Sequence, residues 1–293
     1  MYDVIIIGKG PAGISAALYI KRANLSVLVI GKDIGALEKA KTIENYYGIT
    51  ATGKEIFENG IKQAESLQIP IKTEEVLSIS YDNTFIIQTN QEKYEAKAVL
   101  LATGTNRIIP LIKGLKEFEG KGVSYCAVCD GFLYRGQEVA VLGNGEYALH
   151  EAQELSNIAK TVTILTNGKD KENIQEKLQN EENKIKINEK EIEEFEGDTI
   201  IRKAKFKDNT ELLIRGLFVA EGVATSIDFA RKLGAKIAQN KIVVNSKMET
   251  NIPGLYAAGD CTGGLLQIST AVAEGAIAGA EIIKFIRESK EEK

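Results

Sequence analysis

The chain has 293 residues with a formal net charge of -4, a pI near 5.5, and 44% hydrophobic and 27% charged residues. This length and balance predict a globular protein of two domains. The acidic charge argues against the basic face that a nucleic acid or an anionic membrane requires, so we expect neither partner.

The sequence predicts neither a membrane span nor a secretory signal. No apolar run approaches the roughly 20 residues that a membrane-spanning helix needs, and the start MYDVIIIG lacks the architecture of a cleavable signal. We therefore expect a cytoplasmic location. In that reducing compartment three cysteines do not form a structural disulfide framework, so the pair Cys126 and Cys129 is metal-binding, redox-active or incidental.

The first predicted element is a short β-branched strand that enters the turn GKGPAG and is followed by the helical pattern ISAALYIKRAN. In this arrangement Gly8, Gly10 and Gly13 make a tight turn, allow the backbone to approach a pyrophosphate, and let the helix pack on the strand. The helix N-terminus faces the anion. The start of the chain therefore predicts a dinucleotide-binding turn.

Further along, the stretch VSYCAVCDG places two thiols three residues apart in one predicted helical turn. Such a pair can close a disulfide, and a helix N-terminus lowers a thiol pKa, which predicts a reversible dithiol. A zinc or iron-sulfur site normally needs four ligands, and the chain adds only Cys261 and His150. We therefore expect no metal, and a merely structural pair is the other alternative.

The strand, turn and helix then recur in QEVAVLGNGEYALHEAQEL, where Gly143, Gly145 and Ala148 have G-x-G-x-x-A spacing. Each half continues with a second apolar strand, SVLVIG or TVTILT, and later with short strands broken by a DNT turn. Each half closes on an apolar strand that ends in small residues, at 97–104 and 216–222. This parallel organisation predicts two dinucleotide folds in one chain.

The first fold returns near the end of the chain, where NIPGLYAAGDCTGGLLQ supplies a strand and an AGD turn before a long helix of small residues. Asp260, at the end of that strand, is placed to accept hydrogen bonds from the hydroxyls of a bound cofactor. We therefore expect an α/β protein of two Rossmann-like, three-layer ββα domains, the second inserted into the first. The expected domains are residues 1–115 with 246–293, and residues 116–245.

Five stretches carry a family resemblance: GKGPAG, TIENYYG at 42–48, ATG at 102–104, CAVCDGFLYRGQEVAVLG at 126–143 and AAGDCTGGLLQ at 257–267. Together they resemble the low-molecular-weight flavin thioredoxin reductases over nearly the whole chain. The resemblance implies FAD in the discontinuous first domain, the dithiol on the inserted domain, thioredoxin as the substrate, and a homodimer. It extends the FAD site beyond the glycine turn and Asp260 to Pro11, Ala12, Asn45, Ala102, Thr103, Gly104, Gly259, Gln267 and Ile268.

The resemblance also implies roles at the dithiol. Cys129 lies nearer the flavin and takes electrons from it, Cys126 attacks the thioredoxin disulfide, and Asp130 handles the proton. Chemistry independently favours Asp130, because no histidine lies near the thiols and a partly desolvated Asp can be tuned for proton transfer. The alternative is that Asp130 caps the following turn. We expect Cys261 to be a packed free thiol near the cofactor.

The chain departs from the family at the end of the second strand of the inserted domain. NADPH-dependent members carry a His-Arg-Arg cluster there, whose guanidinium groups pair with the 2′-phosphate. This chain has Thr166, Asn167 and Gly168 at those positions, followed by Lys169. A single flexible ammonium is a poor substitute for the guanidinium fork.

Two further departures point the same way. Residues 222–229 read GVATSIDF where NADPH-using relatives have a proline-asparagine pair, and Glu146 and Tyr147 occupy a turn that relatives fill with small residues. Tyr147 is expected to fill space that the pyrophosphate would occupy. We therefore expect the inserted domain to hold no nucleotide and to serve as the platform for the dithiol.

The sequence is accordingly most similar to the ferredoxin-dependent flavin thioredoxin reductases, which lack NADPH-binding motifs and receive electrons from reduced ferredoxin. Its Lys and Arg residues are scattered, so it predicts no docking surface for ferredoxin. Three alternatives stay open: an NADPH-dependent thioredoxin reductase with an atypical pocket, a flavin reductase of another disulfide partner, and a flavoprotein redox sensor.

Overall fold

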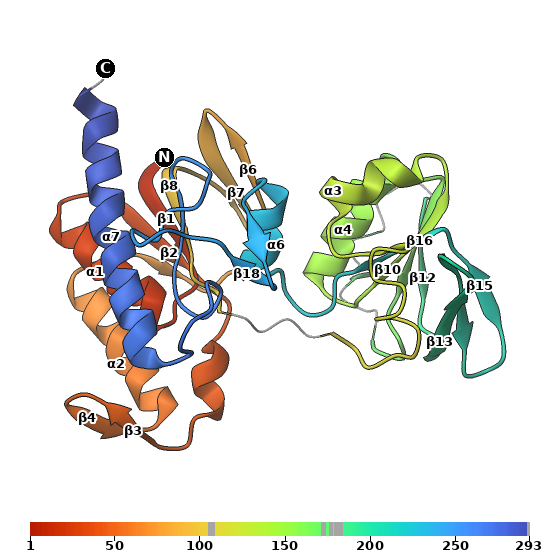
Figure 1. Ribbon diagram of the computed structural model, residues 1–293, viewed down its shortest axis with the longest axis horizontal. Coiled ribbons are helices and arrows are strands. Elements are labelled where there is room, and N and C mark those ends of the chain that lie inside the picture. The colour runs from red at the N-terminus through yellow and green to blue at the C-terminus, as the bar shows by residue number, and fades with distance from the viewer. Residues whose placement is uncertain (105–108, 171–173, 176–177, 179–183, 292–293) are drawn as a thin grey trace. The chain divides into compact units, whose positions relative to one another are not determined.

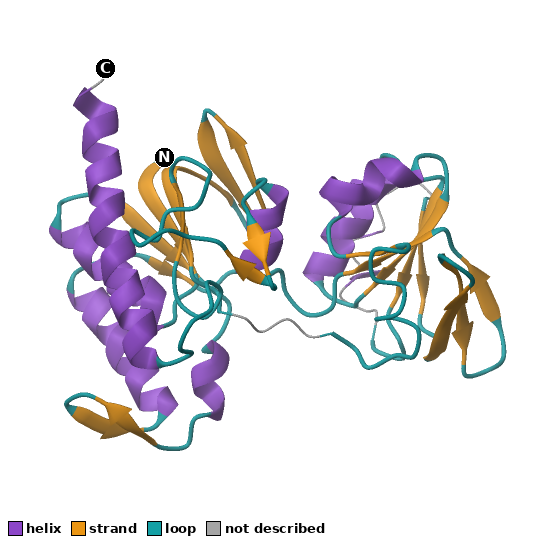
Figure 2. Cartoon of the chain, in the orientation of Figure 1, coloured by secondary structure: helices purple, strands orange, loops and turns teal. Residues whose placement is uncertain are grey.

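A computed structural model describes residues 1–104, 109–170, 174–175, 178 and 184–291 of the chain. The chain divides into two compact units, Met1–Asn106 with Thr225–Lys293, and Arg107–Ala224. Each unit combines a parallel sheet with helices (Figures 1 and 2). The expected α/β class with two Rossmann-like folds, the second inserted in the first, is therefore confirmed.

The first unit is built on a seven-stranded sheet with the order β5-β2-β1-β8-β7-β6, in which β19 also pairs with β8. Its strands are β1 (Tyr2–Ile7), β2 (Val27–Ile30), β5 (Ile71–Lys72), β6 (Val76–Asp82), β7 (Thr84–Thr89), β8 (Lys93–Leu101) and β19 (Leu255–Ala257). The strands β1, β2, β5, β8 and β19 pair in parallel, whereas β6, β7 and β8 form an antiparallel meander. The central strand β1 is buried along its length after Asp3, which is why it reads as a continuous apolar run rather than an alternating one.

Helices and short connecting elements complete the first unit. They are α1 (Pro11–Arg22), η1 (Gly35–Lys39), the hairpin β3 (Ile43–Tyr46) and β4 (Ile49–Ala51), α2 (Gly53–Ser66), α6 (Ser226–Lys232), the pair β17 (Ile237–Ala238) and β18 (Lys241–Ile242), and α7 (Ile268–Glu291). Val4 and Ile6 of β1 pack with α1 and with Ala278 and Ile282 of α7 in one buried cluster. The main core of this unit therefore lies between the sheet and the paired helices α1 and α7.

The second unit has a five-stranded parallel sheet with the order β12-β11-β10-β16-β9 and a separate antiparallel sheet. Its elements are β9 (Val123–Ser124), α3 (Ala127–Asp130), η2 (Gly131–Tyr134), β10 (Glu138–Leu142), α4 (Glu146–Ser156), β11 (Thr161–Leu165), β12 (Ile185–Asn188), β13 (Ile192–Gly197), β14 (Ile201–Phe206), β15 (Glu211–Leu213) and β16 (Gly216–Val219). Leu142 and Leu217 of the parallel sheet share a buried cluster with Phe195 and Phe206 of the antiparallel sheet. The two sheets thus pack face to face, as the ββα layering requires.

The two predicted DNT turns lie where the sequence placed them. Asn83 connects β6 to β7 and Asn209 connects β14 to β15, with φ of 58° and 65°. Asparagine tolerates this left-handed conformation better than most residues, which explains its use at both positions.

The unit boundaries differ from those expected, which placed residues 225–245 in the inserted domain. The hydrogen bonds of this segment go to the first unit. The Ser226 N–H donates to Thr103 Oγ1 at 2.7 Å, and the Ile242 N–H donates to the Cys261 carbonyl at 2.9 Å. At the other crossing the Phe195 N–H donates to the Lys113 carbonyl at 2.9 Å, which ties the residues before 116 to the second unit.

The contact between α1 and α7 gives a test of the first core. A Cβ at Gly275 would lie 2.1 Å from the carbonyl oxygen of Ala12, so Gly275→Ala must push the two helices apart. We expect a loss of about 1 to 3 kcal/mol in the free energy of unfolding, seen as a lower midpoint in urea. Gly60→Ala is the control, because its Cβ would lie 3.7 Å from Ile14 Cγ2 and alanine favours a helix. An unchanged midpoint for Gly275→Ala would contradict this account of the packing.

Candidate functional site

The predicted flavin residues of the first unit follow parallel strands that end at one edge of the sheet. Ile7 pairs with Leu101, and Leu101 pairs with Ala257. The turns that begin at Gly8 and Ala102 therefore lie next to each other, together with the turn after β19. In open α/β sheets ligands bind at this carboxyl edge.

The glycine-rich turn fits a pyrophosphate. A Cβ at Gly8 would lie 2.2 Å from the Ala102 carbonyl oxygen, and one at Gly13 would lie 1.9 Å from the Gly8 carbonyl oxygen. A Cβ at Gly10, in contrast, would meet no heavy atom within 4 Å, so the space in front of this residue is open. Helix α1 starts with Pro11 and has neither a side-chain cap nor an acidic residue in its first turn. Its N-terminus can therefore receive an anion.

The turns after β8 and β19 complete this edge. The Thr103 N–H donates to Ser226 Oγ at 3.0 Å, which fixes the Ala102 to Gly104 segment. The Gly259 N–H donates to Glu274 Oε2 at 2.7 Å, and a Cβ at Gly259 would lie 3.1 Å from that of Ala12. Asp260 accepts from Lys241 Nζ at 2.8 Å through its backbone carbonyl, not its carboxylate.

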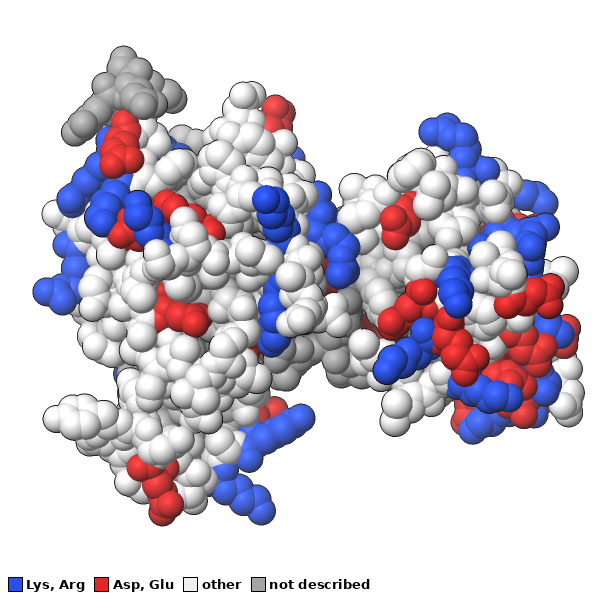
Figure 3. Space-filling view, in the orientation of Figure 1, with Lys and Arg blue, Asp and Glu red and all other residues white. Residues whose placement is uncertain are grey.

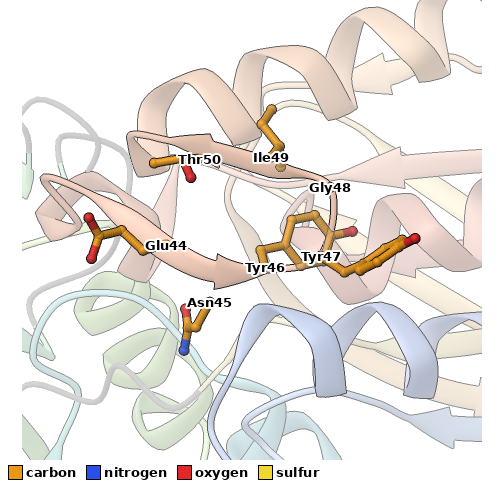
Figure 4. A pocket seen from close by; sticks show the side chains of 7 residues that line it. All are labelled: Glu44, Asn45, Tyr46, Tyr47, Gly48, Ile49 and Thr50. Atoms are coloured by element: carbon orange, nitrogen blue, oxygen red, sulfur yellow. The ribbon is translucent and has the colours of Figure 1, made fainter.

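A hydrogen bond connects two of the predicted flavin residues that lie far apart in the sequence. Asn45 Nδ2 donates to Gln267 Oε1 at 2.9 Å across 222 positions, just before Ile268 begins α7. Asn45 also lines a pocket of about 470 Å³ formed by residues 44–50 of the β3–β4 hairpin (Figure 4). In that view its amide points away from the hairpin tip, where Tyr46 and Tyr47 lie.

In the second unit Cys126 and Cys129 form a disulfide with Cα atoms 5.3 Å apart. Cys126 precedes α3 and is 1% exposed, whereas Cys129 is half-buried. The two cysteines therefore differ in access to solvent. Among the described residues no group of three or more His, Cys, Asp or Glu side chains is arranged to hold a metal ion.

The Asp130 carboxylate is linked to Cys126 through one side chain. Ser124 Oγ donates to Asp130 Oδ2 at 2.6 Å and accepts from the Cys126 N–H at 3.1 Å. Burial, together with the charge of Asp130, raises the pKa of Tyr134. The alternative that Asp130 caps the following turn is wrong, because its side chain makes no cap bond to η2.

Cys261 is the free cysteine and lies fully buried in the first unit. Its Sγ lies 3.5 Å from the Leu101 carbonyl and 3.4 Å from that of Ala258. Burial raises the pKa of this thiol to about 12, so the thiol stays protonated at neutral pH. This agrees with the expectation of a packed free thiol.

The second glycine-rich turn repeats the geometry of the first but is followed by different side chains. A Cβ at Gly143 would lie 2.3 Å from the Ala220 carbonyl oxygen. Glu146 stands in the first turn of α4, and Tyr147 is 2% exposed and therefore fills interior space. A carboxylate in this first helical turn disfavours the anion that the turn would otherwise attract.

The segment after β11 is a tight turn with no guanidinium group. Asn167 and Gly168 have φ of 53° and 77°, and the Lys169 N–H donates to the Thr166 carbonyl at 3.2 Å, as in a type I′ turn. The buried Thr166 hydroxyl donates to the Lys169 carbonyl at 2.7 Å. Lys169 Nζ in turn forms an ion pair with the buried carboxylate of Glu221. Because β11 and β16 flank β10, this pair spans the edge of the sheet beside Gly143.

Sequence reasoning missed the polar residues that support both sites. Ser226 bonds to Thr103, Glu274 bonds to Gly259, and the buried Glu151 accepts from the Ala127 N–H at 2.9 Å. Ser124 is the one with a local signal, since it lies two residues before Cys126. The others meet partners that are 15 to 123 positions away in the sequence.

A dinucleotide-binding edge in one unit and a redox-competent disulfide in the other define a flavin-dependent disulfide oxidoreductase. The chain matches the family model described as pyridine nucleotide-disulphide oxidoreductase over residues 2–275, and it belongs to that family. FAD, the expected cofactor, is confirmed as the cofactor of this family. In the part of the chain that the structure describes, no helix is long and apolar enough to cross a bilayer.

Thioredoxin reductases are among the similar proteins. The enzyme of Bacillus subtilis is 33% identical, with 99% of this chain and 96% of that protein covered, and the enzyme of Peptoclostridium acidaminophilum is 34% identical over 100% and 99%. Among solved structures, the atypical thioredoxin reductase TRi of Desulfovibrio vulgaris Hildenborough is 40% identical with a TM-score of 0.92, covering 98% and 99% of the two chains. The ferredoxin-flavin thioredoxin reductase of Clostridium acetobutylicum is 34% identical with a TM-score of 0.70, covering 98% of each chain.

The open space at Gly10 gives a test of the flavin site. In Gly10→Val the added Cβ has no protein heavy atom within 4 Å, so the fold is expected to be kept. The new side chain would occupy the space through which the pyrophosphate approaches the backbone. We expect a folded, colourless protein, measured as flavin absorbance per protein against the circular dichroism of the unmodified chain. Full flavin content in Gly10→Val would show that the glycine turn is not part of the cofactor site.

Proposed function

We propose that this chain is a thioredoxin reductase that receives electrons from reduced ferredoxin and passes them through FAD to the Cys126–Cys129 disulfide. The donor assignment rests on the nucleotide edge of the second unit. There Lys169, which directly follows the altered motif, is engaged in an ion pair with Glu221. The likeness to the ferredoxin-flavin thioredoxin reductase of Clostridium acetobutylicum supports the same assignment.

In this proposal the first unit holds the cofactor. Gly8, Gly10 and Gly13 with the N-terminus of α1 bind the pyrophosphate, and Asp260 binds the hydroxyl-bearing chain through its carboxylate. The remaining proposed contacts are Pro11, Ala12, Asn45, Ala102, Thr103, Gly104, Gly259, Gln267 and Ile268. When bound, FAD would supply a redox group that can take up electrons one at a time and give them up as a pair to a disulfide.

The dithiol then divides the work between its two sulfurs. From the family resemblance, Cys129 takes the electrons from the cofactor and Cys126 attacks the disulfide of thioredoxin, although Cys126 is the more buried of the two in this structure. Asp130 handles the proton of the departing thiol, the role that the family resemblance implies, and Ser124 Oγ, which also accepts from the backbone N–H of Cys126, fixes the Asp130 carboxylate beside the dithiol turn. Such a role suits a half-buried carboxylate that a hydroxyl group orients.

Apolar side chains next to the disulfide support a protein as the substrate. Val128, Phe132 and Leu133 are 55%, 61% and 57% exposed, close to both cysteines in sequence. Large apolar residues grouped on a surface are typical of a site where another protein binds. We extend the proposal, from the family resemblance, to a homodimer located in the cytoplasm.

The antiparallel sheet of the second unit is a poor docking surface for ferredoxin. Lys and Arg side chains alternate there with Asp and Glu (Figure 3). Lys203 pairs with Glu196 and Glu211, and Lys205 pairs with two further carboxylates. A surface whose charges are paired in this way attracts a charged partner only weakly.

A second candidate is an NADPH-dependent thioredoxin reductase with an atypical pocket. It is favoured by the second glycine turn, because Gly143 approaches Ala220 as Gly8 approaches Ala102. A Cβ at Gly145 would meet nothing closer than the Gly222 carbonyl oxygen at 3.6 Å, so some room remains there.

The dithiol role is tested by single substitutions. We expect Cys126→Ser and Cys129→Ser each to abolish thioredoxin reduction and to leave FAD bound, since the cofactor residues belong to the other unit. Turnover with thioredoxin and flavin absorbance measure the two effects. Cys261→Ala is the control and should keep its turnover, because this thiol is buried and protonated. Turnover by Cys129→Ser would exclude the pair as the relay.

The donor is tested by anaerobic reduction of the yellow protein. Loss of two charge-assisted hydrogen bonds, worth roughly 1.5 to 3 kcal/mol each, weakens NADPH binding at least about 100-fold. We therefore expect neither NADPH nor NADH to bleach the flavin at ordinary concentrations, and reduced ferredoxin to bleach it and drive thioredoxin reduction. Stoichiometric, rapid bleaching by micromolar NADPH would make the second candidate the better one.

Grafting the missing cluster tests the turn itself. Replacing Thr166-Asn167-Gly168 by His-Arg-Arg puts arginine where φ is 53° and 77°, and a Cβ at Gly168 would lie 2.7 Å from Glu191 Cγ. We expect at best weak NADPH affinity by fluorescence titration, with about 1 to 2 kcal/mol of stability lost at each left-handed arginine. Micromolar affinity in an equally stable variant would show that the turn adapts freely.

A further inference from the structure

One buried carboxylate lies beside the redox disulfide and has no part in the chemistry described above. Glu151 of α4 is 1% exposed, and its Oε2 accepts from the N–H of Ala127, the residue that follows Cys126. We infer that Glu151 is a positioning residue that fixes the dithiol turn and, through its negative charge, keeps the Cys126–Cys129 couple strongly reducing. The inference rests on the dithiol role proposed above.

The geometry shows how Glu151 fixes the turn. The Cys126 N–H donates to Ser124 Oγ at 3.1 Å, the next N–H, of Ala127, donates to Glu151, and the Cys129 N–H lies 3.2 Å from Cys126 Sγ. Successive backbone donors around Cys126 are therefore bound by side chains from two different elements. Since α4 is a long, well-buried helix, it supplies a rigid support for the four-residue helix α3.

The charge of Glu151 acts on the reduced form. Two electrons and two protons convert the Sγ–Sγ bond into two thiols, and Cys126 must then lose its proton to become the attacking thiolate. A helix N-terminus lowers a thiol pKa, whereas a nearby carboxylate raises it. Glu151 therefore offsets the helix and limits the stabilisation of the thiolate. A couple whose reduced form is stabilised is oxidising. Glu151 limits the stabilisation of the reduced form and therefore makes this couple more reducing.

Other titratable groups occur on the elements packed against the dithiol. They are Asp130 of α3, Tyr134 of η2, and Glu146, Tyr147, His150, Glu151 and Glu154 of α4. Asp130 is bound by Ser124, and Glu154 is exposed. Glu151 bonds to the backbone between the two cysteines, so its charge is the one to remove.

The test is the dithiol–disulfide equilibrium of the FAD-loaded full chain with glutathione, read by thiol alkylation and mass. We expect Glu151→Gln, which keeps the shape and a hydrogen-bond acceptor, to shift the equilibrium at least about tenfold toward the dithiol, or about 30 mV. Glu154→Gln removes the same charge from an exposed position of the same helix and should leave the equilibrium unchanged, as should the charge-conserving Glu151→Asp. An unchanged equilibrium in Glu151→Gln overturns the inference.

A second measurement avoids any change at Glu151. In Cys129→Ser the alkylation rate of Cys126 should rise with pH with a midpoint at or above that of an ordinary thiol, about 8.5. A midpoint below that value means that the helix dominates and overturns the inference. Both measurements use neither thioredoxin, ferredoxin nor NADPH, so they can fail or succeed independently of the proposed function.

Discussion

The fold depends on a close approach of two backbones at the carboxyl ends of neighbouring parallel strands. In the first unit a Cβ at Gly8 would come within 2.2 Å of the Ala102 carbonyl oxygen, and in the second a Cβ at Gly143 would come within 2.3 Å of the Ala220 carbonyl oxygen. Any side chain at either glycine would force the strands apart. The turn, the start of the following helix and the edge of the sheet all take their positions from this contact.

The same backbone contact occurs in both units, but the side chains around it differ. In the first, the space in front of Gly10 is open and the helix that follows has no acidic residue in its first turn. In the second, Glu146 occupies the first turn and an ion pair between Lys169 and Glu221 spans the edge of the sheet. One backbone arrangement thus carries an open edge in one unit and, in the other, an edge occupied in part by an acidic residue and an ion pair.

The sequence predicted features that are set by nearby residues. The glycine turns, the two DNT turns and the pairing of thiols within one helical turn all have local signals, and the structure contains each of them. It did not predict that residues 225–245 belong to the first unit, nor the roles of Ser226 and Glu151 as supports. These depend on hydrogen bonds between residues 123 and 24 positions apart, whose geometry exists only after the sheets have formed.

The turn after β11 also constrains how this sequence can change over generations. Because Asn167 and Gly168 both adopt left-handed backbone conformations, an arginine at either position carries a cost in stability before any second arginine can add a ligand contact. If Lys169 turned away to bind a phosphate, the buried carboxylate of Glu221 would lose its ion-pair partner, which is costly. Stepwise mutation toward a phosphate-reading cluster therefore passes through less stable intermediates, and selection would hold this lineage to the turn that it has.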